Sequence, residues 1–107
     1  MTRKDIRKLD KFVSDKVRAK GQCDRCQGRT TLQTSHIYSR RYLSIRWHPL
    51  NLNCFDAKCH FWYGQNPIDG VEWVKNYLGE KKFAQLRMLR NRLGKDLTVE
   101  GVKLWWS

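Results

Sequence analysis

Apolar residues recur at three- and four-residue spacing over residues 2–19, and they are Ile6, Leu9, Val13 and Val17. This spacing is typical of an amphipathic helix, because side chains three and four positions apart share one helix face. Thr2 and Asp5 have the spacing of a capping box at its start. We therefore predict that the chain begins with a helix.

Two shorter stretches predict strands. Residues 30–37 are rich in β-branched side chains and end close to His36, and residues 49–55 form a second extended run. Asp56 then has the position of a helix cap, with Cys59 and His60 on the first turn of a short helix. Neighbouring residues on a helix point about 100° apart, so these two side chains can face different sites.

The C-terminal part of the chain predicts two further helices. Asn66 and Pro67 have the cap and first-turn positions of a helix that ends at Gly79. Residues 80–93 carry a second apolar stripe with basic residues around it. We expect these two helices to form a hairpin that packs on the preceding segment.

The tail is open to two interpretations. Thr98 could cap a short helix, or the segment could be extended. In either case we expect Trp105 and Trp106 to dock on the core. The elements together predict a small α+β fold.

Length and charge narrow the function. At 107 residues the chain is a single domain by length, with a basic helix at 1–20, a central region at 21–64 and a helical part at 65–107. Lys and Arg number 22 against 10 Asp and Glu, a net charge of +12. This excess favours nucleic acid as a partner, because neutralised phosphates release their counterions. A membrane surface is less favoured, because no segment combines a broad apolar face with basic flanks.

The cysteines indicate metal chemistry. No apolar run follows the basic N-terminus, so we expect no signal peptide, no membrane segment and a reducing, cytoplasmic location. There, cysteine pairs are more typical of metal or redox sites than of disulfides. Cys23 and Cys26 are separated by two residues and flanked by glycine and polar residues, as in a zinc knuckle. A redox pair usually opens a helix after a strand, so a metal site is favoured if a second pair lies downstream.

Residues 38–47 mix arginines with aromatic residues. Guanidinium groups match phosphate oxygens in geometry, so we predict that Arg40, Arg41 and Arg46 contact nucleic acid. Aromatic rings can stack on unpaired bases, but we expect the rings of this segment to belong to the core.

The order of these features resembles an HNH, or ββα-metal, nuclease, with signature positions at His36, Asn51 and His60. The closer resemblance is to the phage NinG/Rap recombination nucleases, in which an Asn-Pro follows, here Asn66 and Pro67. The resemblance covers roughly residues 22–80. It implies a zinc-stapled ββα-metal module, flanked by the N-terminal helix and the C-terminal helical hairpin.

The predicted zinc ligands are Cys23, Cys26, Cys59 and a fourth residue. The resemblance places a cysteine at position 56, where this chain has Asp56, and Cys54 stands two residues earlier. We favour Cys54 as the fourth ligand over Asp56, because structural zinc sites favour thiolates and the aspartate already has a capping role.

The resemblance also implies single-metal phosphodiester hydrolysis. His36 would take a proton from water, and His60 would hold Mg²⁺ or Mn²⁺. Asn51 would either complete the shell of that ion or fix the loop and the tilt of His36. Ser35 stands where many HNH nucleases carry an Asp or His ligand, so the ion would keep water and phosphate oxygens as ligands. His48 is left out of the site, as a surface residue.

We therefore expect a metal-dependent DNA endonuclease with structural Zn²⁺. The resemblance implies branched DNA, such as phage recombination or replication intermediates, as the substrate. Symmetrical resolution of a four-way junction would require a homodimer. The alternative is a catalytically inactive, zinc-stabilised nucleic-acid-binding module, which the missing ligand at Ser35 favours. A thiol redox protein is a more distant third hypothesis.

Overall fold

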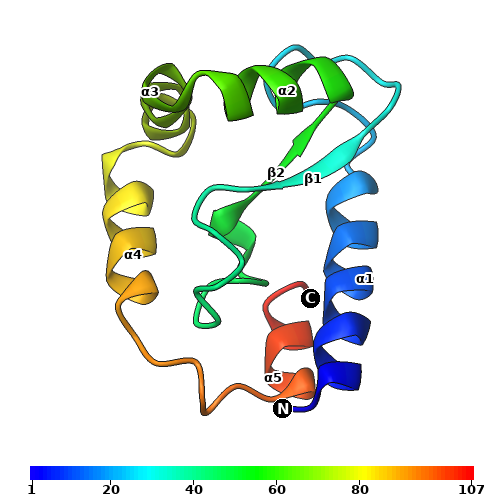
Figure 1. Cartoon of the computed structure of the whole chain (residues 1–107), viewed down its shortest axis with the longest axis vertical. Helices are drawn as coiled ribbons and strands as arrows, with labels where there is room; N and C mark the ends of the chain where they lie inside the picture. The colour runs from blue at the N-terminus through cyan, green and yellow to red at the C-terminus, as the bar shows by residue number, and fades with distance from the viewer.

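A two-stranded antiparallel sheet lies inside a frame of helices (Figure 1). The computed structural model describes residues 1–107. The elements in chain order are α1 (Arg3–Arg18), β1 (Gln33–His36), the 3₁₀ turn η1 (Pro49–Asn51), β2 (Leu52–Phe55), α2 (Ala57–Gln65), α3 (Pro67–Leu78), α4 (Glu80–Arg90) and α5 (Val99–Leu104). The predicted α+β class is confirmed.

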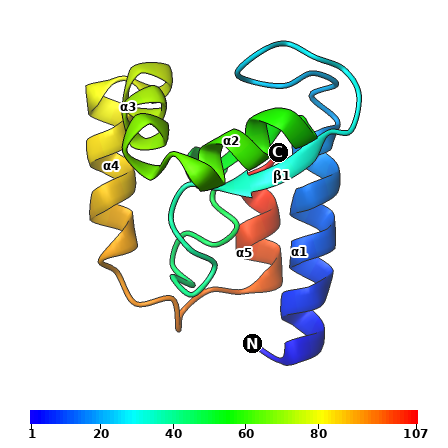
Figure 2. The ribbon, with the colours of Figure 1, turned by 45° about the horizontal axis from the view of Figure 1, so that its top comes forward.

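Helix α1 forms on the predicted pattern and covers one face of the sheet. Both capping-box hydrogen bonds between Thr2 and Asp5 are present. Its buried face belongs to the α1 core, which consists of Leu9, Val13, Val17, Trp47, Leu52, Cys54 and Val102. Helix α5 lies beside α1 and contributes Val102 to this core (Figures 1 and 2).

The register of the sheet decides which side chains face α1. Strands β1 and β2 are antiparallel, and Thr34 stands opposite Cys54. Opposed residues of a sheet share a face, and Thr34 Oγ1 lies 3.0 Å from Ser14 Oγ of α1. Successive residues alternate between faces. Cys54 and His36 therefore lie on the α1 face, whereas Phe55 lies on the other.

The opposite face of the sheet supports a smaller apolar cluster formed by Cys23, Phe55 and Cys59. The ring centroid of Phe55 lies 5.7 Å from that of Tyr63 and 5.4 Å from that of Trp73. Aromatic pairs at these separations are favourable beyond their buried area. Phe55 therefore holds both α2 and α3 against the sheet.

Several element boundaries differ from the sequence prediction. The first strand is shorter than residues 30–37, because Thr31 has a φ of 53°, which interrupts the extended chain. The predicted second strand begins with a 3₁₀ turn at Pro49, capped by His48. Helix α4 ends at Arg90 rather than at residue 93.

The tail forms the short helix, capped by Thr98, that was one of its two interpretations. Trp106 Nε1 donates to the carbonyl oxygen of Trp47 at 2.7 Å. The ring of Trp105 lies 4.9 Å from that of His48. Both tail tryptophans are therefore docked on the core as predicted. His48 was predicted to be a surface residue, but it is half-buried between its capping contact and this ring.

Helices α3 and α4 meet at a corner instead of forming the predicted hairpin. Figure 1 shows α3 nearly end-on while α4 runs down the side of the molecule. Gly79, with a φ of 84°, is the only residue between them. An antiparallel helix pair needs a connection of about two to five residues, so one glycine turns the chain without reversing it. None of the helices is long and apolar enough to cross a membrane.

Candidate metal centre and cleft

Three cysteines and an aspartate meet at the first turn of α2. Their ligand atoms all lie within 4.8 Å of one another, and the residues are Cys23, Cys26, Asp56 and Cys59. Around one tetrahedral ion with Zn–S bonds of about 2.3 Å, sulfur atoms are about 3.8 Å apart. This metal cluster could therefore hold an ion, and three thiolates with one carboxylate are consistent with structural zinc.

Short backbone hydrogen bonds shape the turn that carries the first two cysteines. Cys23 N donates to Gly28 O at 2.7 Å, and Gln27 N donates to Cys23 O at 3.0 Å. A Cβ atom at position 28 would lie 2.8 Å from Oδ2 of Asp56 and 3.3 Å from Sγ of Cys26. A side chain at position 28 would therefore displace ligand atoms of the metal cluster, which glycine avoids.

Asp56 serves both the helix and the metal cluster. Its Oδ1 accepts from Cys59 N at 2.8 Å, which caps α2, and its Oδ2 accepts from the Cys26 thiol at 2.9 Å. These hydrogen bonds hold the pKa of the Asp56 carboxyl below its ordinary value. Burial raises the pKa of Cys59 to about 12, so an ion would have to displace the thiol proton when it binds.

The preference for Cys54 over Asp56 as the fourth ligand is corrected by this geometry. The Cys54 side chain belongs to the α1 core, on the face of the sheet that points towards α1. Burial raises the pKa of its thiol. Its main chain still supports the site, because Asp24 N donates to Cys54 O at 2.7 Å and Cys54 N donates to Asp24 Oδ2 at 2.9 Å. Cys54 thus anchors the turn through its backbone.

Arg25 is a part of the site that the sequence analysis missed. Its Nη1 lies 3.5 Å from Cys59 Sγ, and its guanidinium carbon lies 3.7 Å from the centroid of the Trp62 ring. A cation beside a thiolate offsets the negative charge of a ligand set with three thiolates and a carboxylate. Its place between Cys23 and Cys26 could have indicated that Arg25 lies beside the metal ligands.

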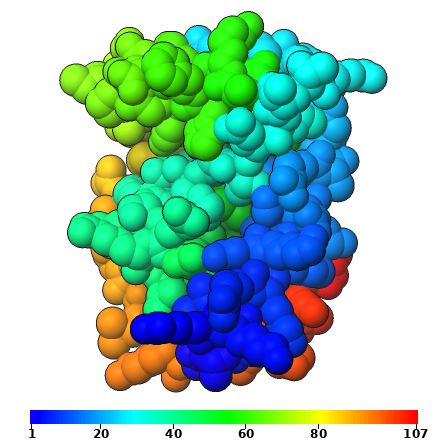
Figure 3. Space-filling model, turned by 45° about the vertical axis from the view of Figure 1, so that its right-hand side comes forward, coloured from blue at the N-terminus to red at the C-terminus, as the bar shows by residue number.

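A cleft of about 650 Å³ lies on the other side of α2. Figure 3 shows it as a hollow between α2 and the loop that follows β1, with α1 alongside. His36 from β1 and His60 from α2 both line it, together with Arg40, Ser39 and Asp10. The fold therefore brings the two predicted catalytic histidines to one surface.

His36 is held in its neutral form. Burial, together with the positive charges of Arg40 and Arg46, lowers the pKa of the His36 imidazole to about 4. A histidine with this pKa is unprotonated at neutral pH, so its free nitrogen can accept a proton. This is the state that a general base needs.

His60 is oriented by Gln33 of β1. Its Nδ1 lies 2.6 Å from Gln33 Oε1, so Nδ1 carries the proton and donates it to the amide oxygen. The lone pair on Nε2 is then available to an ion. Histidines that bind metals commonly donate their other ring N–H to an oxygen in this way. Gln33 was not identified from the sequence, where nothing distinguished it from other strand residues.

Asn51 is buried and fixes the loop after His36. Its Oδ1 accepts from Tyr38 N at 2.8 Å, and its Nδ2 donates to Tyr38 O at 3.1 Å. The Asn51 side chain is 0% exposed. Of its two predicted roles, the contacts favour fixing the loop over completing the shell of an ion. Ser35 is also buried and lies opposite Asn53 in the sheet.

The predicted arginines have three different environments. Arg46 donates from Nε and Nη2 to the two carboxylate oxygens of Asp10, at 3.0 and 2.7 Å. Trp47 Nε1 also donates to Asp10, at 2.8 Å. Arg46 therefore ties its loop to α1 instead of presenting a free guanidinium. Arg40 is exposed at the edge of the cleft, and Arg41 is exposed on the far side of the loop.

Asp10 is a cleft residue that the sequence analysis missed. Although burial opposes it, hydrogen bonds from Arg46 and Trp47 hold the pKa of the Asp10 carboxyl below its ordinary value. The partners of this carboxylate are more than 30 residues away in sequence, so no local pattern indicated them.

Comparisons of the chain with protein-family models, with curated proteins and with solved structures found no match.

Proposed function

We propose that this protein is a metal-dependent DNA endonuclease of the HNH type. The observation that carries the proposal is that His36 and His60 line one cleft, one from the end of β1 and the other from the first turn of α2. A neutral histidine that lines the same cleft as a histidine with a free Nε2 is an arrangement suited to phosphodiester hydrolysis. The resemblance in the order of these residues supports the same function.

His36 acts as the general base in this proposal. Its low pKa keeps it unprotonated at neutral pH, and it accepts a proton from the attacking water. Asn51 positions His36 by holding the loop at Tyr38. Mg²⁺ or Mn²⁺ held by His60 would supply Lewis-acid stabilisation of the charge on the phosphate.

DNA binding follows from charge. The net charge of +12 attracts a polyanion, and Arg40 stands exposed at the edge of the cleft, where it can pair with a phosphate next to the cleaved one. Branched phage recombination intermediates as substrates, and a homodimer to cut them symmetrically, rest on the resemblance alone. A cytoplasmic location belongs to the same proposal, because a thiolate metal site needs reduced cysteines.

The metal cluster is structural in this proposal. Zn²⁺ bound by Cys23, Cys26, Asp56 and Cys59 would hold the knuckle against α2. The next residue, His60, then keeps its direction into the cleft. Zinc therefore supports the catalytic arrangement without lying in the cleft.

A cleavage assay tests the proposal. Purified protein is incubated with supercoiled, linear and branched DNA in Mg²⁺ and in Mn²⁺, and the products are separated on gels. We expect cleavage by the wild type, a loss of at least 100-fold in His36→Ala, as for removal of a general base, and activity retained in His48→Asn. The His48 variant is the matched control, because asparagine preserves a helix cap. If no substrate is cut in either metal, the endonuclease proposal fails.

The second candidate is a zinc-stabilised DNA-binding module without catalysis. The observation in its favour is that Ser35 is buried and supplies no carboxylate or imidazole beside His60. An ion in the cleft would then depend largely on water and phosphate oxygens. This candidate predicts salt-sensitive DNA binding by the wild type and by His36→Ala alike, with no cleavage by either protein.

A further inference from the structure

A second groove of about 340 Å³ lies across the loop from the cleft, where the end of α4 meets residues 41–44. Three arginines line it, namely Arg41, Arg90 and Arg92. Its lining contains no aspartate or glutamate. We call this surface the arginine groove.

The two sides of the arginine groove are packed directly on each other. Ser44 Oγ donates to Arg90 O at 3.2 Å. A Cβ atom on Gly94 would lie 2.7 Å from Leu43 Cβ and 2.9 Å from Ser44 N. Such close approach needs glycine, and it holds the segment after α4 against the loop. The backbone that carries the arginines is therefore held in place on both sides of the groove.

The positive charge in the arginine groove is not neutralised within the chain. The ion pairs of the structure involve other basic residues, namely Lys11, Arg18, Lys20 and Arg46. Arg41 instead donates to the Tyr42 hydroxyl at 2.9 Å. The guanidinium carbon of Arg90 lies 4.9 Å from the Tyr38 ring centroid and 5.8 Å from that of Tyr42. Stacking on aromatic rings orders a guanidinium while leaving its charge available to an anion.

The loop connects the arginine groove to the cleft. Arg40 lines the cleft and its neighbour Arg41 lines the groove, so the loop forms the ridge between them. A polyanion that crosses this ridge would meet an unpaired arginine on each side of it.

We propose that the arginine groove is a second phosphate-binding site, which holds the backbone of DNA that extends beyond the cleft. This inference rests on the proposed function in that the DNA lies across the cleft. The ligands are phosphodiester groups, bound by Arg41, Arg90 and Arg92. Tyr42 contributes by ordering the arginines rather than by contacting the phosphates.

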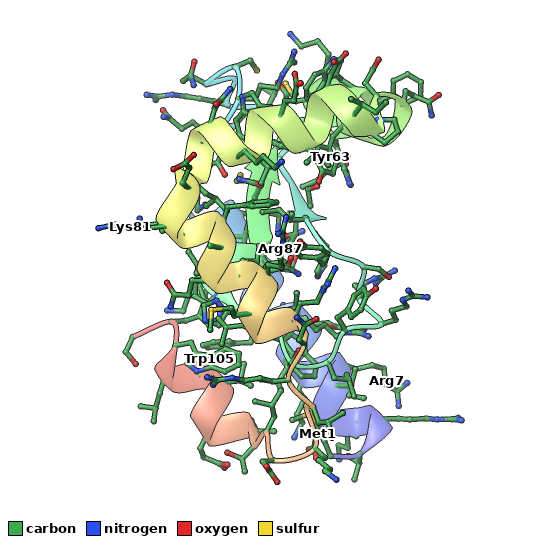
Figure 4. All side chains as sticks on the ribbon, turned by 90° about the vertical axis from the view of Figure 1, so that its left-hand side faces the viewer. Met1, Arg7, Tyr63, Lys81, Arg87 and Trp105 are labelled. Atoms are coloured by element: carbon green, nitrogen blue, oxygen red, sulfur yellow. The ribbon has the colours of Figure 1, made fainter.

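The salt dependence of DNA binding tests the arginine groove. Arg90→Gln/Arg92→Gln is compared with Lys81→Gln/Lys82→Gln, which removes the same charge from the first turn of α4. Lys81 extends from α4 on the side away from Arg87 in Figure 4, and neither lysine lines the groove. Anisotropy of a labelled 20-base-pair duplex is measured at several salt concentrations with no divalent ion added, and circular dichroism confirms that each variant is folded.

Each arginine that neutralises one phosphate contributes about 0.9 to the slope of log K against log salt concentration. The Arg90/Arg92 variant should therefore lower the slope by about 1.8, whereas the lysine variant should keep the wild-type slope. Arg92→Gln alone, an exposed substitution that spares the stacked Arg90, should lower it by about 0.9. Equal slopes for the two double variants, or no binding by the wild type, would overturn the proposal.

These outcomes are separate from those of the cleavage assay. If the wild type binds with a groove-dependent slope but cuts no DNA, the phosphate site stands and the endonuclease proposal fails. If the wild type cuts DNA while both double variants bind as it does, the endonuclease stands and the arginine groove fails.

Discussion

Substitutions at Cys54 and Asp56 distinguish the two candidate fourth ligands of the metal cluster. Cys54→Ala removes one buried sulfur atom from the α1 core. A loss of this size resembles Ile→Val, so we expect the free energy of unfolding to fall by about 0.5–1.5 kcal/mol. The affinity for zinc should be unchanged, because the Cys54 side chain lies in the α1 core and not among the ligand atoms of the cluster.

Asp56→Ala should have a much larger effect on zinc. Structural zinc sites bind with about 10–16 kcal/mol, and one of four ligands accounts for about 2.5–4 kcal/mol if the ligands share this equally. At about 1.4 kcal/mol for each tenfold change, the affinity for zinc should fall by about 60- to 700-fold. Asp56→Ala also removes the cap of α2, which should lower the free energy of unfolding by about 0.5–2 kcal/mol.

The assay is competition for zinc with a chromophoric chelator, and thermal unfolding is measured in parallel. Asp56→Asn separates the two roles of the residue, because asparagine is as good a helix cap as aspartate but lacks the ionised oxygen. In the absence of zinc we expect Asp56→Asn to unfold at the same temperature as the wild type. We expect it to bind zinc more weakly than the wild type. Loss of zinc from Cys54→Ala together with unchanged binding by Asp56→Asn would refute this assignment.

Three further predictions follow from the contacts of the site. Asn51→Ala removes both hydrogen bonds to Tyr38 and leaves the partly buried N–H of Tyr38 without a partner, so the free energy of unfolding in urea should fall by about 2–4 kcal/mol. A loss below about 0.5 kcal/mol would show that the loop does not need these hydrogen bonds. Gly28→Ala places a Cβ atom against Asp56 and should weaken zinc binding in the competition assay, whereas Gly64→Ala, which meets nothing within 4 Å, should not. The pKa of His36 is lowered from 6.5 to about 4, so between these pH values the unfolded chain binds more protons than the folded one. The free energy of unfolding should be highest above pH 6.5 and fall by about 1–2 kcal/mol, after allowance for solvent screening, as the pH drops towards 4. A His36→Gln protein with the same pH dependence would contradict this.

Local signals in the sequence were sufficient to predict that the helices exist. The stripe of α1, the proline at the start of α3 and the glycine after it each act within a few residues of the positions they specify. Cap and termination preferences are local by nature. For the same reason, Thr98 correctly indicated α5 as one of two options.

Features that depend on pairing between distant segments could not be predicted from the sequence. Cys54 and Asp56 both stand near Cys59 in sequence, and only the register of β2 with β1 shows that Cys54 faces α1. Arg46 was interpreted as a phosphate contact, because its partner Asp10 lies on a helix 36 residues earlier in the chain. The arginine groove likewise joins two segments that are far apart in sequence.

The position of the metal cluster explains how such a short sheet can support a cleft. A sheet of two four-residue strands is at best marginally stable by itself. His36 belongs to β1 and His60 to α2, so their separation depends on what holds that helix to the sheet. The metal cluster joins Asp56 and Cys59, at the first turn of α2, to the turn that carries Cys23 and Cys26. That turn is hydrogen-bonded to β2 at Cys54. If this cluster holds zinc as proposed, removing the ion with a chelator would free the turn, and the geometry of the cleft should fail before the α1 core unfolds.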